Sequence, residues 1–251
     1  MFQEERLKDI LQHLNRQEKI TVEDICRLFG VSRDTARRDI VKLEEQGLIT
    51  RARGGAVLPP FTKHLMDYEQ RLKSESAHKQ AIGKAAAALV RPGDYLILDA
   101  STTVQQAAAQ FATAGHVIVT NSADIAGLLA REESNDVYLL GGKLHPQYRY
   151  ISGPRAISQL AEYNADKLFL GTGGLGPEGV FSFTEEYGFL MREMIARAEQ
   201  TILLADHTKF NKKTFHFVSG WDSIDMLVTN QPPDEAMQRI LDQHQVKWIQ
   251  A

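Results

Sequence analysis

Cysteine is almost absent from this chain of 251 residues, and long apolar runs are missing. Cys26 stands alone, which excludes an internal disulfide, and its apolar neighbours Leu28 and Phe29 predict a buried structural thiol. No apolar run approaches the roughly 18 residues that cross a membrane. The polar, acidic start at residues 1–6 lacks the apolar core of a secretion signal. These absences predict a cytoplasmic protein that does not bind a membrane.

Signatures of metal binding and catalysis are missing as well. The 8 histidines show no His-x-x-x-His spacing, and there is no cysteine cluster. Neither the Gly-x-Ser-x-Gly elbow nor the Gly-x-x-x-x-Gly-Lys-Ser/Thr phosphate loop is present. Residues 171–176 are superficially similar to a dinucleotide fingerprint, but the spacing is wrong and the run follows the fourth predicted strand rather than the first. We therefore expect no cofactor and no bound metal.

The composition that remains is that of an ordinary globular protein. With 43% hydrophobic and 24% charged residues, the chain can form one large domain, or a small one plus a larger one. The net charge of −3 hides a local excess of basic residues. Between positions 27 and 53 these are Arg27, Arg33, Arg37, Arg38, Lys42, Arg51 and Arg53, against Asp34, Asp39, Glu44 and Glu45. A small basic patch on an acidic protein favours a compact DNA-reading module over a nonspecific nucleic-acid coat.

Residues 33–45 form the strongest predicted helix. Ser32 suits the N-cap, since its hydroxyl can accept a bond from a free N–H group of the first turn. The apolar positions Ala36, Ile40 and Leu43 share one face, and Gly47 is expected to end the helix. The opposite face and the cap carry the candidate DNA contacts, which are Ser32, Arg33, Thr35, Arg37 and Arg38. Such a helix can hold guanine edges and phosphates in a major groove, although it could also be a solvated charged face.

Neighbouring segments extend this helix into a winged helix-turn-helix domain, predicted over residues 1–58. Residues 4–16 have helical periodicity, and residues 20–22 alternate like a short strand. Thr21 can cap a second helix, with Asp24 completing a capping box. The apolar residues expected to face the core from this helix are Val22, Ile25, Leu28 and Phe29. Two extended runs around Gly54–Gly55 predict a hairpin wing, on which Arg51 and Arg53 could reach a phosphate or the minor groove.

Beyond this module the chain changes to alternating helices and strands. Pro59–Pro60 is expected to end the first domain, followed by a linker over residues 59–76 and an α/β domain over residues 77–251. Strands are predicted near residues 95–98, 117–119, 137–140, 168–170, 201–204, 226–228 and 246–249. Helices are predicted near residues 79–90, 104–111, 123–131 and 187–198. The alternation predicts a mainly parallel sheet covered by helices.

Polar or glycine-rich residues follow the predicted strands, where parallel sheets bind ligands. The first strand leads through Asp99 to Ser101, Thr102 and Thr103, which form a natural phosphate seat at a helix start. Later strands end in Thr120–Asn121, Gly141–Gly142, the loop that begins at Gly171, and residues 206–209. In the last loop, Asp206 could accept from a sugar hydroxyl and Lys209 could bind a phosphate. The alternative is that these residues merely cap helices and pair with one another.

These motifs resemble the DeoR-type transcriptional repressors of sugar catabolism. The N-terminal match comprises Arg6, Ile10, Leu11, Val31, Ser32, Thr35–Ile40, Leu43, Glu44, Gly47, Arg51 and Gly54–Ala56. Ala36 and Arg53 stand where the family usually has Ile and often has His. The C-terminal half resembles the family's sensor domain, which is similar in fold to ribose-5-phosphate isomerase. It matches the family's Asp-x-Gly-Thr-Thr motif over Asp99–Thr103, with Ser101 in place of the glycine, and also at Thr120–Asn121, Gly141–Gly142, Gly171, Gly179, Glu186, Asp206, Lys209 and Phe210.

The resemblance implies a sequence-specific DNA-binding regulator that represses a carbohydrate operon and is controlled by a phosphorylated sugar. It also implies that Arg71 and Lys79 lie at the entrance of the effector pocket and that Glu186 belongs to the effector-binding residues. Because pseudo-palindromic operators need symmetric partners, we expect a homo-oligomer, a dimer or tetramer joined mainly through the C-terminal domain, on double-stranded operator DNA. The alternative is a sugar-phosphate isomerase-like enzyme with an appended DNA-binding module.

Overall fold

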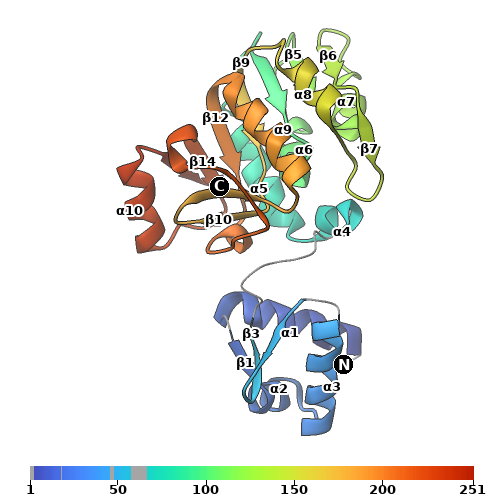
Figure 1. Ribbon diagram of the computed structural model, residues 1–251, viewed down its shortest axis with the longest axis vertical. Coiled ribbons are helices and arrows are strands. Elements are labelled where there is room, and N and C mark those ends of the chain that lie inside the picture. The colour runs from blue at the N-terminus through green and yellow to red at the C-terminus, as the bar shows by residue number, and fades with distance from the viewer. Residues whose placement is uncertain (1–2, 18, 46–47, 58–66) are drawn as a thin grey trace. The chain divides into compact units, whose positions relative to one another are not determined.

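The computed structural model describes residues 3–17, 19–45, 48–57 and 67–251 (Figure 1). The chain divides into two compact units, Met1–His64 and Leu65–Ala251. The predicted helix stop at Gly47 and the predicted domain end at Pro59–Pro60 lie outside the described residues. None of the helices in the described ranges is both long enough and apolar enough to span a lipid bilayer.

The first unit is a winged helix-turn-helix, which confirms the predicted fold class for the N-terminal part. Its helices are α1 (Gln3–Gln17), α2 (Val22–Phe29) and α3 (Arg33–Glu45). Its strands are β1 (Lys19–Thr21), β2 (Thr50–Ala52) and β3 (Gly55–Val57). They form an antiparallel sheet in the order β1-β3-β2, with the wing hairpin turning at residues 53–54.

Local sequence explains how the elements of this unit join. Thr21 and Asp24 form the predicted capping box at the start of α2. Gly30 adopts φ 64° between α2 and α3, a backbone conformation that favours glycine. The side chain of Leu28 is 49% exposed, so its predicted place in the core was wrong. On a helical wheel Leu28 lies off the stripe formed by Val22, Ile25 and residue 29.

A buried ion pair ties α1 to α3. The Arg6 guanidinium donates to the Asp39 carboxylate from Nε at 2.6 Å and from Nη2 at 3.2 Å. Their side chains are only 8% and 0% exposed, and the Gln3 side chain donates a further bond to Asp39 at 3.0 Å. This hydrogen bonding raises the pKa of Arg6. This ion pair therefore holds α1 and α3 together, and both of its charged groups are buried and hydrogen-bonded.

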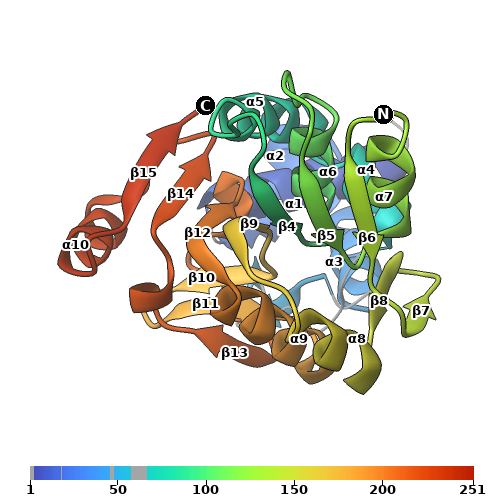
Figure 2. The ribbon, with the colours of Figure 1, turned by 90° about the horizontal axis from the view of Figure 1, so that it is seen from above.

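The second unit is built on a seven-stranded sheet, all of whose strand pairs are parallel (Figure 2). The strand order is β15-β14-β12-β9-β4-β5-β6. In chain order the bounds are β4 (Tyr95–Leu98), β5 (Val117–Thr120), β6 (Asp136–Leu139), β9 (Ala165–Leu170), β12 (Ala198–Leu204), β14 (Met226–Thr229) and β15 (Lys247–Gln250). The predicted parallel α/β domain is thereby confirmed.

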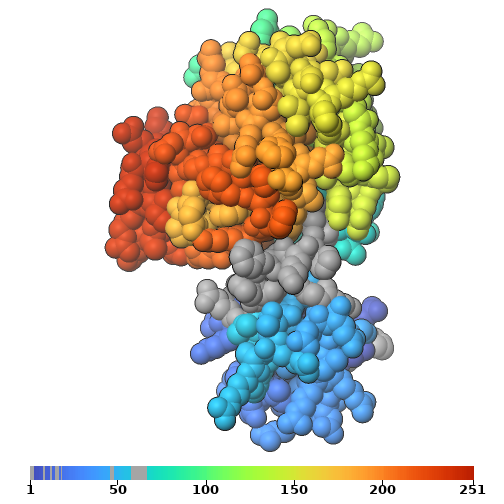
Figure 3. Space-filling view, viewed as in Figure 1, coloured from blue at the N-terminus to red at the C-terminus, as the bar shows by residue number. Residues whose placement is uncertain are grey.

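Helices cover both faces of the sheet. One face packs on α5 (Ser76–Ala87), α6 (Thr102–Ala108) and α7 (Ala123–Leu129), through a core that includes Ile82, Val104 and Ile125. The other face packs on α8 (Pro154–Leu160), α9 (Glu185–Ala196) and α10 (Glu235–Gln243), through a core that includes Leu160 and Leu190. In Figure 3 side chains from α8 onward, coloured yellow to red, form a large part of the visible surface of this unit.

Smaller elements complete the unit at the carboxyl edge of the sheet. They are the hairpin β7 (Lys143–His145) and β8 (Tyr150–Ser152), a small sheet of β10 (Gly174–Gly176), β11 (Gly179–Ser182) and β13 (His216–Ser219), the short helix α4 (Tyr68–Lys73), and the 3-10 turn η1 (His207–Lys209). A second 3-10 turn, η2 (Trp221–Ser223), precedes β14. The part of the predicted linker that the structure describes thus forms α4 and the start of α5.

Replacing Asp39 with Ala should destabilise the first unit by about 3–5 kcal/mol, because Arg6 would stay buried without its carboxylate. Hydrogen exchange of the α1 and α3 amides in the full chain measures this loss. Asp34→Ala is the matched control, because Asp34 lies on the same helix but is exposed and should cost less than about 1 kcal/mol. Equal protection in the two variants would contradict the role of the pair.

Candidate functional site

The strand order creates a crevice at the carboxyl edge of the sheet. From β4 the chain runs outward through β5 and β6, and then returns to β9 on the other side of β4 and runs outward again. The segments that leave β4 and β9 therefore go to opposite faces, and ligands bind at such a switch point. A cavity lies there, lined by the residues that follow β4 (Asp99–Ser101) and β9 (Gly171–Gly173), by Lys209 of η1 and by Arg71 of α4.

A buried carboxylate forms one wall of this cavity. The Asp99 carboxylate accepts a bond from the backbone N–H of Ser101 at 3.0 Å, and the Tyr187 hydroxyl lies 3.4 Å from its other oxygen. Burial raises the pKa of Asp99 to about 6 and raises that of Tyr187. A Cβ atom on Gly171 would stand 2.3 Å from Cβ of Ser101, so the serine fits only because position 171 has no side chain.

Several cations lie in or near the cavity lining. Arg71 and Lys209 line it, and burial lowers the pKa of both. Burial also lowers the pKa of Lys79 and of Lys212 to about 8, and in each case the charge of Lys209 contributes to the shift. These groups therefore stand in a place where their charged forms are disfavoured. A bound anion would relieve both the desolvation and the mutual repulsion, so the geometry suits a phosphate.

Asp206 partly balances these cations from inside the protein. It is 2% exposed, and its carboxylate accepts from the backbone N–H of Thr208 at 2.9 Å, which caps η1. Burial raises the pKa of Asp206, but the charges of Lys209 and Lys79 and the bonds from Thr208 outweigh that effect and hold it below its usual range. Asp206 thus holds the η1 turn in shape while it supports the charge of Lys209.

In the first unit, the predicted DNA-contacting residues form an exposed face on α3 and the wing. Arg37 and Arg38 are exposed, and Ser32 accepts from the backbone N–H of Thr35 at 3.2 Å, as an N-cap does. Arg33 pairs with Glu23 at 2.9 Å and has a side chain that is 68% exposed. Exposed ion pairs of this kind add little stability, so Arg33 can exchange Glu23 for a DNA phosphate at small cost.

The wing offers two further basic residues. The side chain of Arg51 is 58% exposed and pairs with Glu44 of α3 at 2.6 Å, and Arg53 is exposed in the turn between β2 and β3. The close approach of this hairpin to β1 requires Gly55, since a Cβ atom there would lie 2.0 Å from the carbonyl oxygen of Ile20. The wing is therefore fixed to the body of the unit while its arginines face outward.

Comparison with protein-family models identifies both the first and the second unit. The DeoR-like helix-turn-helix domain matches residues 6–60, and the DeoR C-terminal sensor domain matches residues 74–231. The chain belongs to the DeoR family. This DeoR-family chain is therefore a DNA-binding transcriptional regulator with a sensor domain, as the sequence motifs predicted.

Curated relatives of this DeoR-family regulator are transcriptional repressors. The HTH-type transcriptional repressor GlcR of Bacillus subtilis is 44% identical over 99% of this chain and 96% of its own length. The HTH-type transcriptional repressor CsqR of Escherichia coli is 30% identical, over 97% of this chain and 94% of its own length. The glycerol-3-phosphate regulon repressor of Escherichia coli is 26% identical over 98% of each chain.

Solved structures resemble the regulator only distantly. Ribose 5-phosphate isomerase A from Methanocaldococcus jannaschii has a TM-score of 0.39 and 16% identity, over 55% of this chain and 55% of its own. The translation initiation factor eIF-2B from Pyrococcus horikoshii has a TM-score of 0.42 and 13% identity, over 89% of this chain and 81% of its own. Likenesses at this level carry no argument about function.

The structure brings some of the residues predicted to bind effector to the cavity and places others behind it. Arg71, Asp99, Ser101, Gly171 and Lys209 are lining residues. Predicted residues that the described lining does not include are Lys79, Thr102, Thr103, Thr120, Asn121, Gly141, Gly142, Glu186 and Asp206. The second group consists mainly of residues whose polar atoms bond to the backbone or to neighbouring side chains within the unit.

Thr120 and Asn121 show why a polar strand end need not face the ligand. The Thr120 hydroxyl donates to the carbonyl oxygen of Leu98 at 2.7 Å and so ties β5 to β4. The Asn121 side chain donates to the carbonyl oxygen of Ile151 at 3.1 Å and holds β8 in place. Thr102 and Thr103 are 3% and 6% exposed in the first turn of α6.

The remaining predicted residues support the loops around the cavity. Gly141 donates its backbone N–H to the Gln159 side chain at 2.6 Å, and at Gly142 a Cβ atom would lie 2.5 Å from the carbonyl oxygen of Ser152. Glu186 accepts from the Ser152 hydroxyl at 2.8 Å, in the first turn of α9. These positions shape the rim, because they fix β8 and the loop after β6.

Sequence reasoning missed several aromatic and hydroxyl residues of the cavity lining. Tyr150, Thr184 and Tyr187 line the cavity, and the rings of Tyr150 and Tyr187 lie 4.3 Å apart between centroids. They come from β8 and from the start of α9, which strand-end reasoning does not reach. Thr172 and Gly173 also line the cavity, and the glycine-rich run at residues 171–176 was the signal for them.

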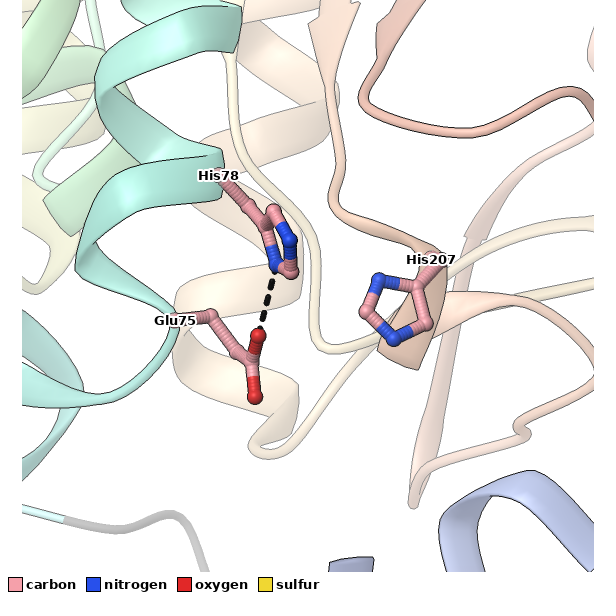
Figure 4. A group of neighbouring side chains, drawn as sticks. All are labelled: Glu75, His78 and His207. Carbon is pink, nitrogen blue, oxygen red and sulfur yellow. Dashed lines mark hydrogen bonds and ion pairs between the residues drawn. The ribbon is translucent and has the colours of Figure 1, made fainter.

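A carboxylate and two histidines, Glu75, His78 and His207, come together between the start of α5 and η1 (Figure 4). Glu75, His78 and His207 each offer a ligand atom within 4.8 Å of the others, a grouping that sequence spacing could not reveal. However, the side-chain oxygen of Asn230 accepts from the backbone N–H of His207 at 2.8 Å. The side-chain NH2 group of Asn230 then lies 3.0 Å from Nδ1 of His207. Nδ1 of His207 therefore accepts a bond from Asn230, and the ring proton lies on Nε2. A histidine that binds a metal through Nε2 would instead carry its proton on Nδ1 and donate from it. We interpret the trio as a polar contact between α5 and η1 rather than a metal site.

Replacing Asp99 with Asn should stabilise the second unit at neutral pH. The folded-state pKa of Asp99 is raised to about 6, so ionising it opposes folding as pH rises from the unfolded value near 3.8 through 6. The melting-temperature gain of Asp99→Asn over wild type should be small at pH 4 and reach its maximum above pH 6, for a stability difference of up to about 3 kcal/mol. Calorimetry at both pH values measures it, and a gain that does not change with pH would contradict the burial argument.

Proposed function

We propose that this DeoR-family regulator represses a carbohydrate operon in the cytoplasm and that a phosphorylated sugar binding in the sensor cavity controls it. The observation that carries the proposal is the pairing of two lining cations, Arg71 and Lys209, with a buried carboxylate, Asp99, at the switch point of the sheet. Such a cavity offers cations for the phosphate group and a carboxylate for the hydroxyl groups of a sugar phosphate. One of the relatives, a glycerol-3-phosphate regulon repressor, is itself named for a phosphorylated metabolite.

The chemistry of the lining side chains supports this assignment. Arg71 and Lys209 provide charge-assisted donors for phosphate oxygens, which give the stronger class of hydrogen bond. The side-chain oxygens of Asp99, Ser101 and Thr184 each accept a bond within the protein, and their remaining lone pairs can accept from sugar hydroxyls. The ring of Tyr150 adds apolar surface, which a sugar ring also presents. The effector class therefore follows from the lining residues and not from the fold alone.

An isomerase activity is the second candidate, and Asp99 is the observation that favours it. A carboxyl group with a pKa of about 6 in a cavity is suited to general base catalysis. Against this, the oxygens of Asp99 already face Ser101 and Tyr187, which act as donors within the protein. We expect no turnover of pentose or hexose phosphates by the purified protein, and the regulators among its relatives support that expectation.

On the DNA side, α3 is proposed to read the major groove through Arg37 and Arg38. Replacing either arginine with Ala should weaken operator binding by about 1–3 kcal/mol, because a bidentate contact to a guanine edge contributes that amount. Fluorescence anisotropy with operator duplex measures the change. Lys42→Ala is the control, because Lys42 lies in the last turn of α3, away from the end presented to DNA. Unchanged affinity in both arginine variants would remove α3 as the reading helix.

On the sensor side, Arg71→Ala and Lys209→Ala should each weaken the binding of sugar phosphates by tenfold or more, since a charge-assisted hydrogen bond contributes about 1.5–3 kcal/mol. Calorimetric titration with a panel of pentose and hexose phosphates measures the affinities. The matched control is Lys73→Ala, which removes an exposed cation two residues from Arg71 on the same helix. Equal losses in the control would show that binding depends on overall charge and not on the cavity.

We also propose that the regulator acts as a dimer or tetramer joined mainly through its second unit, because symmetric operators need symmetric partners. Light scattering after size exclusion should give a mass that is a multiple of 28.2 kDa at micromolar concentration, with and without DNA. Removing the first unit should leave that multiple unchanged. A monomer under all of these conditions would contradict the proposal.

A further inference from the structure

The short helix α4 carries one of the two lining cations and depends on its neighbours for its position. It has only six residues, Tyr68–Lys73, and helices this short are not stable alone in water. It is also the element of the second unit that directly follows residues 58–66 in the chain. What holds α4 therefore decides where Arg71 stands.

The N-terminal end of α4 is anchored by Tyr68, which is 1% exposed. Its hydroxyl donates to the Gln105 side chain on α6, and its backbone N–H donates to the carbonyl oxygen of Gln147 at 3.0 Å. The guanidinium of Arg149 lies 5.7 Å from the centre of the Tyr68 ring, close enough for a cation–π contact. This end is thus fixed to α6 and to the β7–β8 hairpin.

The C-terminal end of α4 is held by a lysine from another helix. The Lys79 ammonium, from α5, donates to the carbonyl oxygens of Arg71 and of Ser74, the second at 2.7 Å. A cation at the last carbonyls of a helix satisfies groups that have no partner within the helix and complements the helix dipole. Lys79 is 5% exposed and belongs to the residues behind the described cavity lining.

The charge of Lys79 is coupled to the cavity. The pKa of Lys79 is lowered to about 8, chiefly by burial; the charges of Lys209 and Arg71 also lower it, while those of Asp206 and Glu75 raise it. An anion bound by Arg71 and Lys209 would offset their repulsion and favour the charged ammonium that bonds both carbonyls. Occupation of the cavity should therefore strengthen the attachment of α4.

We propose that Lys79 is a positioning residue that holds Arg71 at the cavity through the carbonyls of α4, and that an anion bound there tightens α4 onto the second unit. This inference rests on the proposed effector function of the cavity and assigns to Lys79 a role other than ligand contact. On this proposal, effector binding changes how firmly α4 is attached to the second unit. α4 directly follows the part of the chain that leads from the DNA-binding unit.

The test is hydrogen exchange of the full-length protein with inorganic phosphate as the probe. The amides of Arg71 and Ser74, which bond to the carbonyls of Asp67 and Gln70, report the opening of α4. In the wild type, phosphate at ten times its Kd should slow exchange over residues 67–74 by up to about elevenfold, because opening must release the anion. The loops at residues 99–104 should slow to a similar extent.

Lys79→Met should abolish this response over residues 67–74, leaving a slowing of less than twofold at ten times the Kd measured for that variant, and should weaken phosphate binding. Lys84→Met is the matched control, because Lys84 is exposed on the same helix and should behave like the wild type. Tyr68→Phe is a second variant, which removes only the bond to Gln105. It should speed exchange of α4 without phosphate but keep the full slowing when phosphate is added.

The outcomes separate this inference from the proposed function. If neither inorganic phosphate nor any sugar phosphate slows exchange anywhere in the second unit, the proposed effector site fails. If the loops slow while residues 67–74 do not, α4 is not coupled to the cavity and the inference is overturned. That comparison needs only the wild type, so it decides the question even if Lys79→Met does not fold. A full response in folded Lys79→Met would also overturn it.

Discussion

The divergence of the chain on either side of β4 is the constraint on which the rest of the sensor unit depends. Because β4 pairs with β5 on one side and β9 on the other, the segments that leave β4 and β9 must go to opposite faces of the sheet. The gap between them cannot be filled by either segment, so the carboxyl edge opens there. The residues that follow these two strands, among them Asp99 and Gly171, line the cavity together with Arg71 of α4 and Lys209 of η1.

Ionisable groups whose burial disfavours their charged forms gather at this edge. Asp99 has a raised pKa, while Lys79, Lys209 and Lys212 have lowered ones, so each is held in a place that disfavours its ionised form. Ionised groups of this kind reduce the stability of the fold unless a ligand of opposite charge compensates them. Their concentration in one cavity is typical of a binding site. The winged helix-turn-helix differs, since its buried pair of Arg6 and Asp39 is already complete.

Much of the fold could be predicted from the sequence because local signals and fold agree. The capping box at Thr21, the periodicity of α3 and the short apolar runs of the parallel strands all specify their elements without tertiary information. The hairpin β7–β8 and the small sheet of β10, β11 and β13 were missed. Their segments are short, and tertiary packing rather than periodicity determines their conformation.

The candidate site could be predicted only as far as the strand-end rule reaches. That rule located the loops that begin at Asp99 and Gly171, but it could not show which side chains turn inward. Thr120 has a hydroxyl as Ser101 does, and Asn121 is also polar, yet both donate to the backbone of neighbouring strands. Tyr187 lines the cavity from α9, where the family resemblance had indicated its neighbour Glu186 and the strand-end rule had indicated no residue. The assignments of individual residues to effector and DNA remain predictions.

The central claim is that one chain links occupation of the sensor cavity to DNA affinity. The most direct measurement is the affinity of the wild-type protein for its operator duplex, with and without a saturating concentration of a sugar phosphate that binds it. Coupling between two sites in a regulator typically amounts to about 1–3 kcal/mol, so operator affinity should change by about 5–150-fold, and the duplex should change effector affinity by the same factor. Operator affinity that stays within twofold for every sugar phosphate that binds would contradict the account.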